Sequence, residues 1–417
     1  MLLGPVIVLL ALVRWRRGQL ASPRPLVPAA LGALALTVLC IWAAHGFRYP
    51  TFPEGEAASF NKPLEPMLER AGGLQAPLRL AFDARLLPEP WLYGFTFVIA
   101  HSKARPAFLR GRHRSDGWWW FFPFAFLAKT PIPALALLAI ALALALRGGL
   151  PDDAAPLLVL IGVYWAFSVT SNLNIGSRHL LPALGPLCVL GGAAARGFVG
   201  RGRLAIGVLC AALAVDVAVA WPRYLSWFSP LVGGPADGWR TLVDSSLDWG
   251  QDGPALADEL DRIRQPDEDV WLSWFGSTDP RVYGVDAKPL PSFMPWVGGG
   301  PQPLTPGLYA VSATMLQEIY LPGGGRWSGA DQARYEGLQD TYRGWASEPG
   351  SEAMADMLGG SRQLNAALDA YAVLRFRRLA SYLREQEPVG RAGWSIRIYR
   401  LTPEDLKQAM TRPLPRD

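Results

Sequence analysis

The sequence has few cysteines, few charges and few histidines, and each shortage excludes a class of protein. Its three cysteines, Cys40, Cys188 and Cys210, all fall in apolar runs, which predicts no disulfide framework and no cysteine metal site. The four histidines show no metal-ligand spacing either, so no cofactor is predicted. Basic residues form no dense block, which argues against nucleic-acid binding. A Walker loop, a Gly-x-Gly-x-x-Gly motif and a Gly-x-Ser-x-Gly elbow are also missing.

Charged residues make up only 18% of the 417 residues, and long apolar runs fill the first half of the chain. A soluble domain carries roughly 25% charged residues. The runs end near Trp221, and the second half has an ordinary charge density. Six candidate membrane spans are predicted, over residues 2–13, 26–44, 118–146, 155–169, 180–195 and 204–221.

The predicted fold is therefore an α-helical polytopic membrane domain of about six spans followed by a small α/β extracytoplasmic domain. The membrane domain covers residues 1–221, with an outer loop at 46–117, and the second domain covers residues 222–417. Short-loop cations mark the cytoplasmic side. They are Arg14, Arg16, Arg17, Arg24, Arg147, Arg196, Arg201 and Arg203. We expect a multi-pass membrane protein with its C-terminal domain outside the cytoplasm.

Strands and helices alternate in the second half, as is typical of an α/β domain. Strands are predicted at 269–275, 308–312 and 394–401, and helices at 254–264, 331–345, 352–357, 363–384 and 403–410. The run Thr402-Pro-Glu-Asp405 is a helix start. In the outer loop we expect a helix over 63–72, and interfacial or re-entrant segments over 78–87 and 91–100.

A polar loop, residues 172–182, joins two of the apolar runs and holds Arg178 and His179 at the mouth of the helix bundle. Lys129, at a break in the third apolar run, is predicted on the same face. A cation fixed at the hydrocarbon boundary suits a lipid with an anionic head group. Together these three side chains could bind a lipid phosphate. The alternative is that Arg178 and Lys129 only snorkel to the interface.

Three carboxylates, Asp244, Asp248 and Asp252, stand at four-residue intervals beside Trp249. Asp252 precedes Gly-Pro and is expected to cap the following helix. Asp244 and Asp248 could bind the hydroxyls of a sugar or acceptor, with Trp249 as a stacking face. They could also hold a divalent cation, which nothing else in the sequence supports. Otherwise they are structural turn residues.

Five segments of the chain carry a family resemblance. They are, in order, residues 117–133, Asn174-Ile-Gly-Ser-Arg-His-Leu-Leu-Pro182, Asp244-Ser-Ser-Leu-Asp-Trp-Gly-Gln-Asp252, Trp274-Phe-Gly-Ser-Thr-Asp-Pro-Arg-Val-Tyr-Gly284 and Tyr309-Ala-Val-Ser-Ala-Thr314. They resemble the bacterial membrane glycosyltransferases of the GT-C superfamily, relatives of protein O-mannosyltransferases and aminoarabinose transferases. The second segment resembles that family's Asn-x-Ile-Gly-x-Arg-Tyr-x-Leu-Pro loop. The resemblance implies a location in the bacterial inner membrane.

The resemblance implies that a sugar is transferred from a polyprenyl-phosphate carrier to an acceptor glycan, lipid or protein on the outer face of the membrane. It makes Arg178 a contact to the carrier phosphate and Lys129 a weaker candidate. His179 stands where the family has Tyr, and Ser246 where it has Asn. The family's catalytic Asp loop after the first span has no match, so the catalytic residues are unknown and the chain is expected to be the C-terminal portion of such an enzyme.

The sequence is also compatible with two other functions. One is a non-catalytic membrane-anchored protein that binds a glycan or a partner. The other is a transporter or flippase for a lipid-linked sugar, which should show internal repeats and broken helices in both halves. The sequence shows neither.

Overall fold

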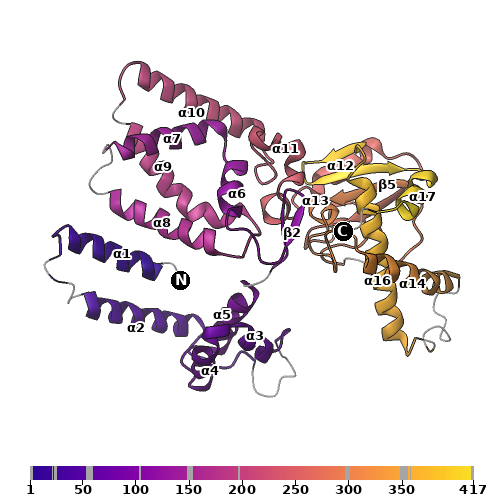
Figure 1. The fold of residues 1–417 in the computed structure, drawn as a ribbon, viewed down its shortest axis with the longest axis horizontal. Coiled ribbons are helices and arrows are strands. Elements are labelled where there is room, and N and C mark those ends of the chain that lie inside the picture. The colour runs from indigo at the N-terminus through magenta and orange to yellow at the C-terminus, as the bar shows by residue number, and fades with distance from the viewer. Residues whose placement is uncertain are drawn as a thin grey trace.

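The computed structural model places a helical part and a mixed α/β part side by side (Figure 1). Two of the cations used to predict orientation, Arg24 and Arg196, lie outside the residues that it describes. The described residues are 3–20, 22, 26–52, 60–102, 105–147, 154–195, 198–295, 301–347, 356 and 358–414.

Each of the six predicted apolar runs is helical. The helices are α1 (Leu3–Arg16), α2 (Leu26–Ala44), α6 (Phe121–Lys129), α7 (Ile132–Leu146), α8 (Ala155–Thr170), α9 (Leu181–Ala195) and α10 (Arg201–Ala220).

Length and bending divide these apolar helices into three groups. With 19 and 20 residues, α2 and α10 are long and apolar enough to cross a membrane. The axes of α6 and α7 meet at 119°, so this pair is a broken span or a re-entrant loop. The remaining α1, α8 and α9 have 14, 16 and 15 residues, fewer than the about 20 that a bilayer requires. By length, the described chain holds two spanning helices, or three with the bent pair, and not the six predicted.

Helices α7 to α10 form the centre of the helical part. Helix α7 packs on α9 and α10, and α8 packs on α9 and α1. The α2 helix contains no buried residue, and leucines along it, such as Leu31 and Leu34, are more than half exposed. Apolar side chains exposed in this number are typical of a surface that meets lipid.

The outer loop folds into a small helical unit and a hairpin. Helices α3 (Leu64–Arg70), α4 (Gln75–Asp83) and α5 (Glu89–Ser102) pack on one another. The helix predicted over 63–72 is thereby confirmed, and the two apolar segments that follow it are helices packed against it. The hairpin of β1 (Ala107–Leu109) and β2 (Arg112–Arg114) was not predicted.

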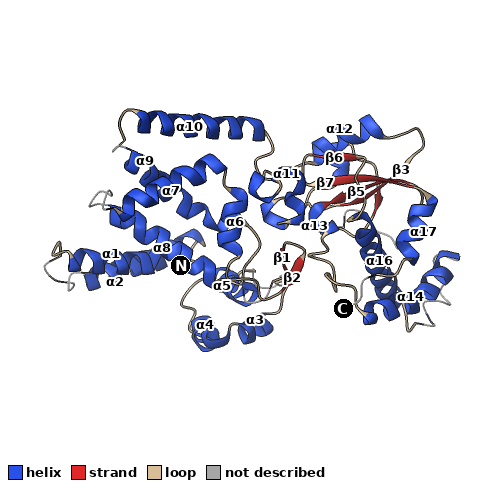
Figure 2. Cartoon of the chain, turned by 45° about the horizontal axis from the view of Figure 1, so that its top comes forward, coloured by secondary structure: helices blue, strands red, loops and turns tan. Residues whose placement is uncertain are grey.

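Five strands form a mixed sheet in the C-terminal part (Figure 2). Their order is β4-β3-β5-β7-β6, with β3 parallel to β4 and β5, and β7 antiparallel to β5 and β6. The three predicted strands are confirmed, whereas the short edge strands β4 and β6 were missed. The strands are β3 (Asp269–Ser273), β4 (Lys288–Pro289), β5 (Gly307–Ser312), β6 (Gly390–Ala392) and β7 (Ile396–Leu401).

The predicted helices of this part are present, except that the one over 352–357 falls outside the described residues apart from Asp356. The start of α17 is the predicted capping box, in which Thr402 and Asp405 exchange hydrogen bonds. The longer helices are α12 (Gly253–Ile263), α14 (Gly329–Ser347), α16 (Ser361–Leu383) and α17 (Pro403–Thr411).

One hydrophobic cluster crosses from the helical part into the sheet. It joins Leu109 of β1 and Phe122 of α6 to Trp271 of β3 and Tyr309 of β5. All four side chains are at most 1% exposed. Because apolar burial is the main stabilising term, this cluster holds the hairpin and α6 against the sheet domain. The domain division at residue 221 stays a prediction.

Candidate functional site

The polar loop between α8 and α9 lies directly on the acidic stretch that follows the last apolar helix. The loop forms the short helix η3 (Ser177–Leu180), and the stretch begins with η6 (Asp244–Ser246). The Ser177 amide donates to Ser246 Oγ at 3.2 Å. A Cβ at Gly176 would lie 2.7 Å from Ser245 Cβ, so only glycine allows this approach. Two predicted halves of the site, far apart in sequence, are therefore in contact.

This contact places Arg178 over the ring of Trp249. Arg178 Cζ is 5.2 Å from the ring centroid, within the range of a cation–π interaction. The Arg178 side chain is exposed, and Trp249 is 51% exposed. A predicted phosphate ligand and a predicted sugar-stacking face are thus neighbours, and both are accessible.

A cavity of about 210 Å³ opens beside Arg178. Its walls come from α6, α8 and the loop, so it is largely apolar and aromatic, with Arg178 and His179 as its basic side chains. Such a cavity matches a molecule with an apolar body and an anionic end. The lining residues are Phe122, Tyr164, Phe167, Ser168, Ser171, Leu173, Arg178, His179 and Pro182.

His179 contributes a neutral imidazole to this cavity. Burial lowers the pKa of His179, and the positive charges of Arg178 and Arg105 lower it further. Nε2 is buried and has no hydrogen-bond partner within the described residues. His179 can therefore donate a hydrogen bond to a ligand or accept one from it, and Arg178 supplies the fixed positive charge.

Lys129 does not line this cavity. Its ammonium donates to the backbone carbonyls of Leu225 at 2.7 Å and Ser246 at 2.8 Å, and to that of Trp227. An ammonium has three donors, and all three are used. The geometry favours a structural role, in which Lys129 joins the end of α6 to η6 and to the segment after α10. A contact between Lys129 and a phosphate stays a prediction.

Asp244 is buried, and both of its carboxylate oxygens accept hydrogen bonds from other side chains. Its Oδ1 accepts from Ser245 Oγ at 3.0 Å, and its Oδ2 accepts from the Tyr320 hydroxyl. Burial raises the pKa of Asp244. Its φ of 57° lies in the left-handed region, which is uncommon outside glycine and concentrates at functional sites.

Arg105 completes this hydrogen-bonded chain. Its Nη2 donates to the Tyr320 hydroxyl at 3.2 Å, which links Arg105 through Tyr320 to Asp244. Sequence reasoning did not identify Arg105 or Tyr320 as site residues. Neither lies in a motif, and only the packing of the outer loop on the C-terminal part brings them to the site.

Asp248 is fully buried. Oδ1 accepts from the Gly250 amide at 3.0 Å, and Oδ2 has no hydrogen-bond partner within the described residues. Burial raises the pKa of Asp248 well above its usual range, and the charges of Asp252 and Asp244 act in the same direction. A contact between a sugar hydroxyl and Asp244 or Asp248 stays a prediction, and Trp249 has the exposed face that a stacking role requires.

Asp252 occupies the predicted capping position, but the predicted hydrogen bond from its side chain to the helix is wrong. Asp252 is the N-cap residue of α12, but its side chain makes no bond to that helix. Oδ2 accepts instead from Ser395 Oγ at 2.7 Å and from the Ser395 amide at 3.3 Å. Ser395 lies directly before β7, so Asp252 joins the acidic stretch to the sheet. Across the described residues, no group of three or more His, Cys, Asp or Glu could hold a metal ion.

All five segments that carry the family resemblance meet around this site. Asn174 Oδ1 accepts from the Trp118 amide at 2.5 Å, which joins the first segment to the second. The Asp244 amide donates to Thr314 Oγ1 at 3.0 Å, which joins the third segment to the fifth. A Cβ at Gly250 would lie 2.9 Å from Gly276 Cα, so the third segment also packs on the fourth.

The comparisons with known proteins add no relative. No protein-family model, no curated protein and no solved structure matches the chain.

Proposed function

We propose that this chain is a membrane glycosyltransferase of GT-C type, or its C-terminal part, that uses a polyprenyl-phosphate-linked sugar. The observation that carries the proposal is the contact of the Arg178 loop with the acidic stretch beside an apolar cavity. This arrangement suits an amphipathic donor, because the isoprenoid can stay against apolar walls while its phosphate reaches Arg178.

Arg178 is the side chain that we assign to the donor phosphate. In the transfer, the acceptor oxygen forms a bond to the anomeric carbon, and the bond from that carbon to the phosphate oxygen breaks. The electron pair of the broken bond stays on the phosphate oxygen. A fixed guanidinium stabilises the charge that grows there. His179 donates a hydrogen bond to the same group, and Trp249 offers its exposed face to the sugar.

A base must remove the proton of the acceptor hydroxyl in this reaction. Asp244 and Asp248 are poorly placed for it, because both are buried and already accept hydrogen bonds from other groups of the chain. We assign the base to no residue of the described chain. We place the protein in the bacterial inner membrane with this site on the outer face, and with the shorter apolar helices completing the bundle.

The same observation favours one alternative, a membrane-anchored protein that binds a lipid-linked glycan without transferring it. Both functions require Arg178 to bind the lipid phosphate, whereas only the transferase releases free polyprenyl phosphate. The sugar acceptor of the transferase is a glycan, a lipid or a protein.

Native mass spectrometry of the full chain in nanodiscs tests the shared requirement. We expect polyprenyl phosphate to bind at least tenfold more tightly than the neutral polyprenol, because a charge-assisted hydrogen bond contributes about 1.5–3 kcal/mol. Arg178→Gln should remove this preference. Arg147→Gln, at an exposed arginine after α7, is the matched control and should keep it. Equal binding of the two lipids, or an unchanged Arg178→Gln variant, would refute the proposal.

A further inference from the structure

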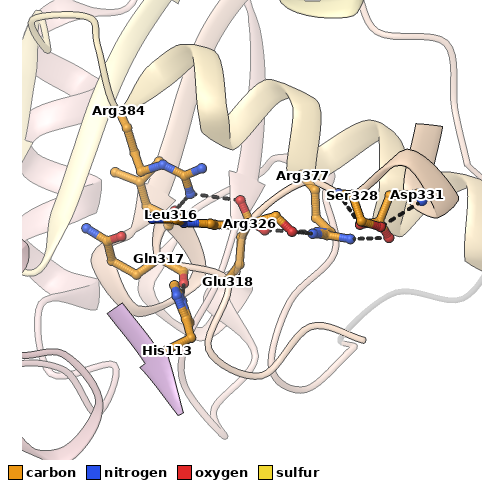
Figure 3. Close-up of polar contacts among 9 residues, drawn as sticks. All are labelled: His113, Leu316, Gln317, Glu318, Arg326, Ser328, Asp331, Arg377 and Arg384. Carbon is orange, nitrogen blue, oxygen red and sulfur yellow. Dashed lines mark hydrogen bonds and ion pairs between the residues drawn. The ribbon is translucent and has the colours of Figure 1, made fainter. Parts of the chain in front are cut away.

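A second pocket lies where the outer-loop hairpin meets the C-terminal part. Its volume is about 370 Å³, and no residue assigned above to the donor lines it. Its wall includes His113 of β2, Trp239 and Arg240 of η5 (Gly238–Arg240), Glu318, Arg377 of α16, and Arg384, the residue directly after α16. Figure 3 shows Glu318 between Arg377 and Arg384, with His113 on the side of the hairpin.

Glu318 is the only carboxylate among the described residues that line the pocket, and it is already paired. It is 2% exposed, and it accepts from Arg377 Nε at 2.9 Å and from Arg384 Nη1 at 2.8 Å. Arg377 also pairs with Asp331 at 2.8 Å, so its charge is neutralised. Glu318 and Asp331 therefore hold Arg377 in place, and Glu318 also holds Arg384. Both carboxylates are paired with arginines, so neither is free to bind a cation.

Two arginines of the wall, Arg240 and Arg384, retain guanidinium N–H groups that make no hydrogen bond within the described residues. The carboxylate nearest to Arg240 is that of Asp237, at 3.9 Å, and both side chains are more than half exposed. Arg384 uses only Nη1 for its two bonds, to Leu316 O and Glu318. Within the described residues, no acceptor satisfies its other two nitrogens.

The pocket wall also contains a neutral hydrogen-bond donor and a tightly packed backbone loop. Trp239 is 4% exposed, and its indole N–H has no hydrogen-bond partner within the described residues. A Cβ at Gly324 would lie 2.1 Å from Glu318 O, so the loop after Glu318 is packed tightly. His113 Nε2 lies 2.6 Å from Gln317 O, which ties the hairpin to the same turn. Donors held in this way bind a ligand at a low entropic cost.

We propose that this pocket binds an oxyanion, a carboxylate or a phosphate, carried by a small polar molecule. Guanidinium groups present paired donors that match either group, and the fixed Arg377–Glu318–Arg384 cluster holds the arginine fork in place. The inference goes beyond the proposed transfer and does not depend on it.

Isothermal titration of the purified full chain in detergent tests the pocket with three probes, glucose 6-phosphate, glucuronate and neutral glucose. We expect at least one of the two anions to bind more than tenfold better than glucose. A preference for one anion would identify the phosphate or the carboxylate as the group that is bound. Equal weak binding of all three probes would overturn the proposal.

Arg240→Glu is the variant to compare with the wild type. The Arg240 side chain is 60% exposed, so its replacement should not prevent folding. It should weaken anion binding at least tenfold, and Arg384→Gln should do so as well. Arg262→Gln, at an exposed arginine of α12, and Arg178→Gln should both bind the anion as the wild type does. Wild-type affinity in Arg240→Glu, or a loss in Arg178→Gln, would place the anion elsewhere.

Discussion

Arg178 lies over the exposed ring of Trp249, with its Cζ 5.2 Å from the ring centroid. The arginine comes from a loop between two apolar helices, and the tryptophan comes from the acidic stretch after the last of them. Their contact makes the two stretches one surface beside an apolar cavity. The following predictions test this surface and the contacts that support it.

Trp249→Ala should weaken the binding of polyprenyl phosphate about two- to fivefold, because an exposed cation–π pair contributes about 0.5–1 kcal/mol. The measurement is the lipid titration in nanodiscs. In a double-mutant cycle with Arg178→Gln, the two effects should not add, since each variant removes the same interaction. Full additivity would show that the two side chains act separately.

Gly176→Ala should push η3 away from η6, because the added Cβ would lie 2.7 Å from Ser245 Cβ. The φ of Gly176 is 178°, an extended conformation open to any residue, so the effect is one of volume alone. We expect weaker lipid binding, restored in the double variant Gly176→Ala/Ser245→Gly. A double variant as weak as the single one would contradict this packing.

Lys129→Met should destabilise the protein by about 3 kcal/mol, the order of cost for breaking a buried hydrogen-bonded charge. The variant leaves three carbonyls without their shared donor. Thermal unfolding in detergent measures the effect, and Lys62→Met, at an exposed lysine, is the control. Normal stability combined with lost lipid binding would instead make Lys129 a phosphate ligand.

Asp248→Asn should stabilise the protein at neutral pH. Burial raises the pKa of Asp248 in the folded state, so the folded protein holds this proton more tightly than the unfolded chain does. The stability is present below the unfolded pKa of about 3.9 and is lost as the pH rises through the folded pKa. Asn mimics the protonated carboxyl and avoids the loss.

The melting temperature of Asp248→Asn should therefore match the wild type near pH 4 and exceed it at pH 7. Asp340→Asn, at a side chain that is 87% exposed, should track the wild type at both values. An Asp248→Asn variant that is less stable at pH 7 would show that the buried carboxyl is ionised.

Local sequence signals predicted the elements well where a pattern repeats over many residues. The apolar runs, the strand at β7 and the capping box at Thr402 all follow from periodicity or from one short motif. The number of spans did not follow, because short runs such as residues 155–169 were counted as spans. Helix α8 ends within one residue of that run and has 16 residues, fewer than the about 20 that a bilayer requires. The edge strands β4 and β6 contain only two and three residues, too few for a period to appear.

The site was predictable in part. The loop with Arg178 and the stretch with Trp249 were each identified from their polar residues, but nothing local indicates that one lies on the other. The buried state of Asp248 and the bond from Ser395 to Asp252 depend on the sheet, which is formed by distant residues. Arg105 and Tyr320 are missed for the same reason, since they meet only in the folded chain.

The most direct test of the central claim is photo-crosslinking with a polyprenyl phosphate whose photoreactive group lies in the isoprenoid unit next to the phosphate. The full chain in nanodiscs would be labelled, digested and mapped by mass spectrometry. Our account predicts that the label falls on the cavity walls near Phe122, Tyr164 or Phe167, and that unlabelled polyprenyl phosphate competes it away. Competed labelling confined to α2 or α10 would contradict it.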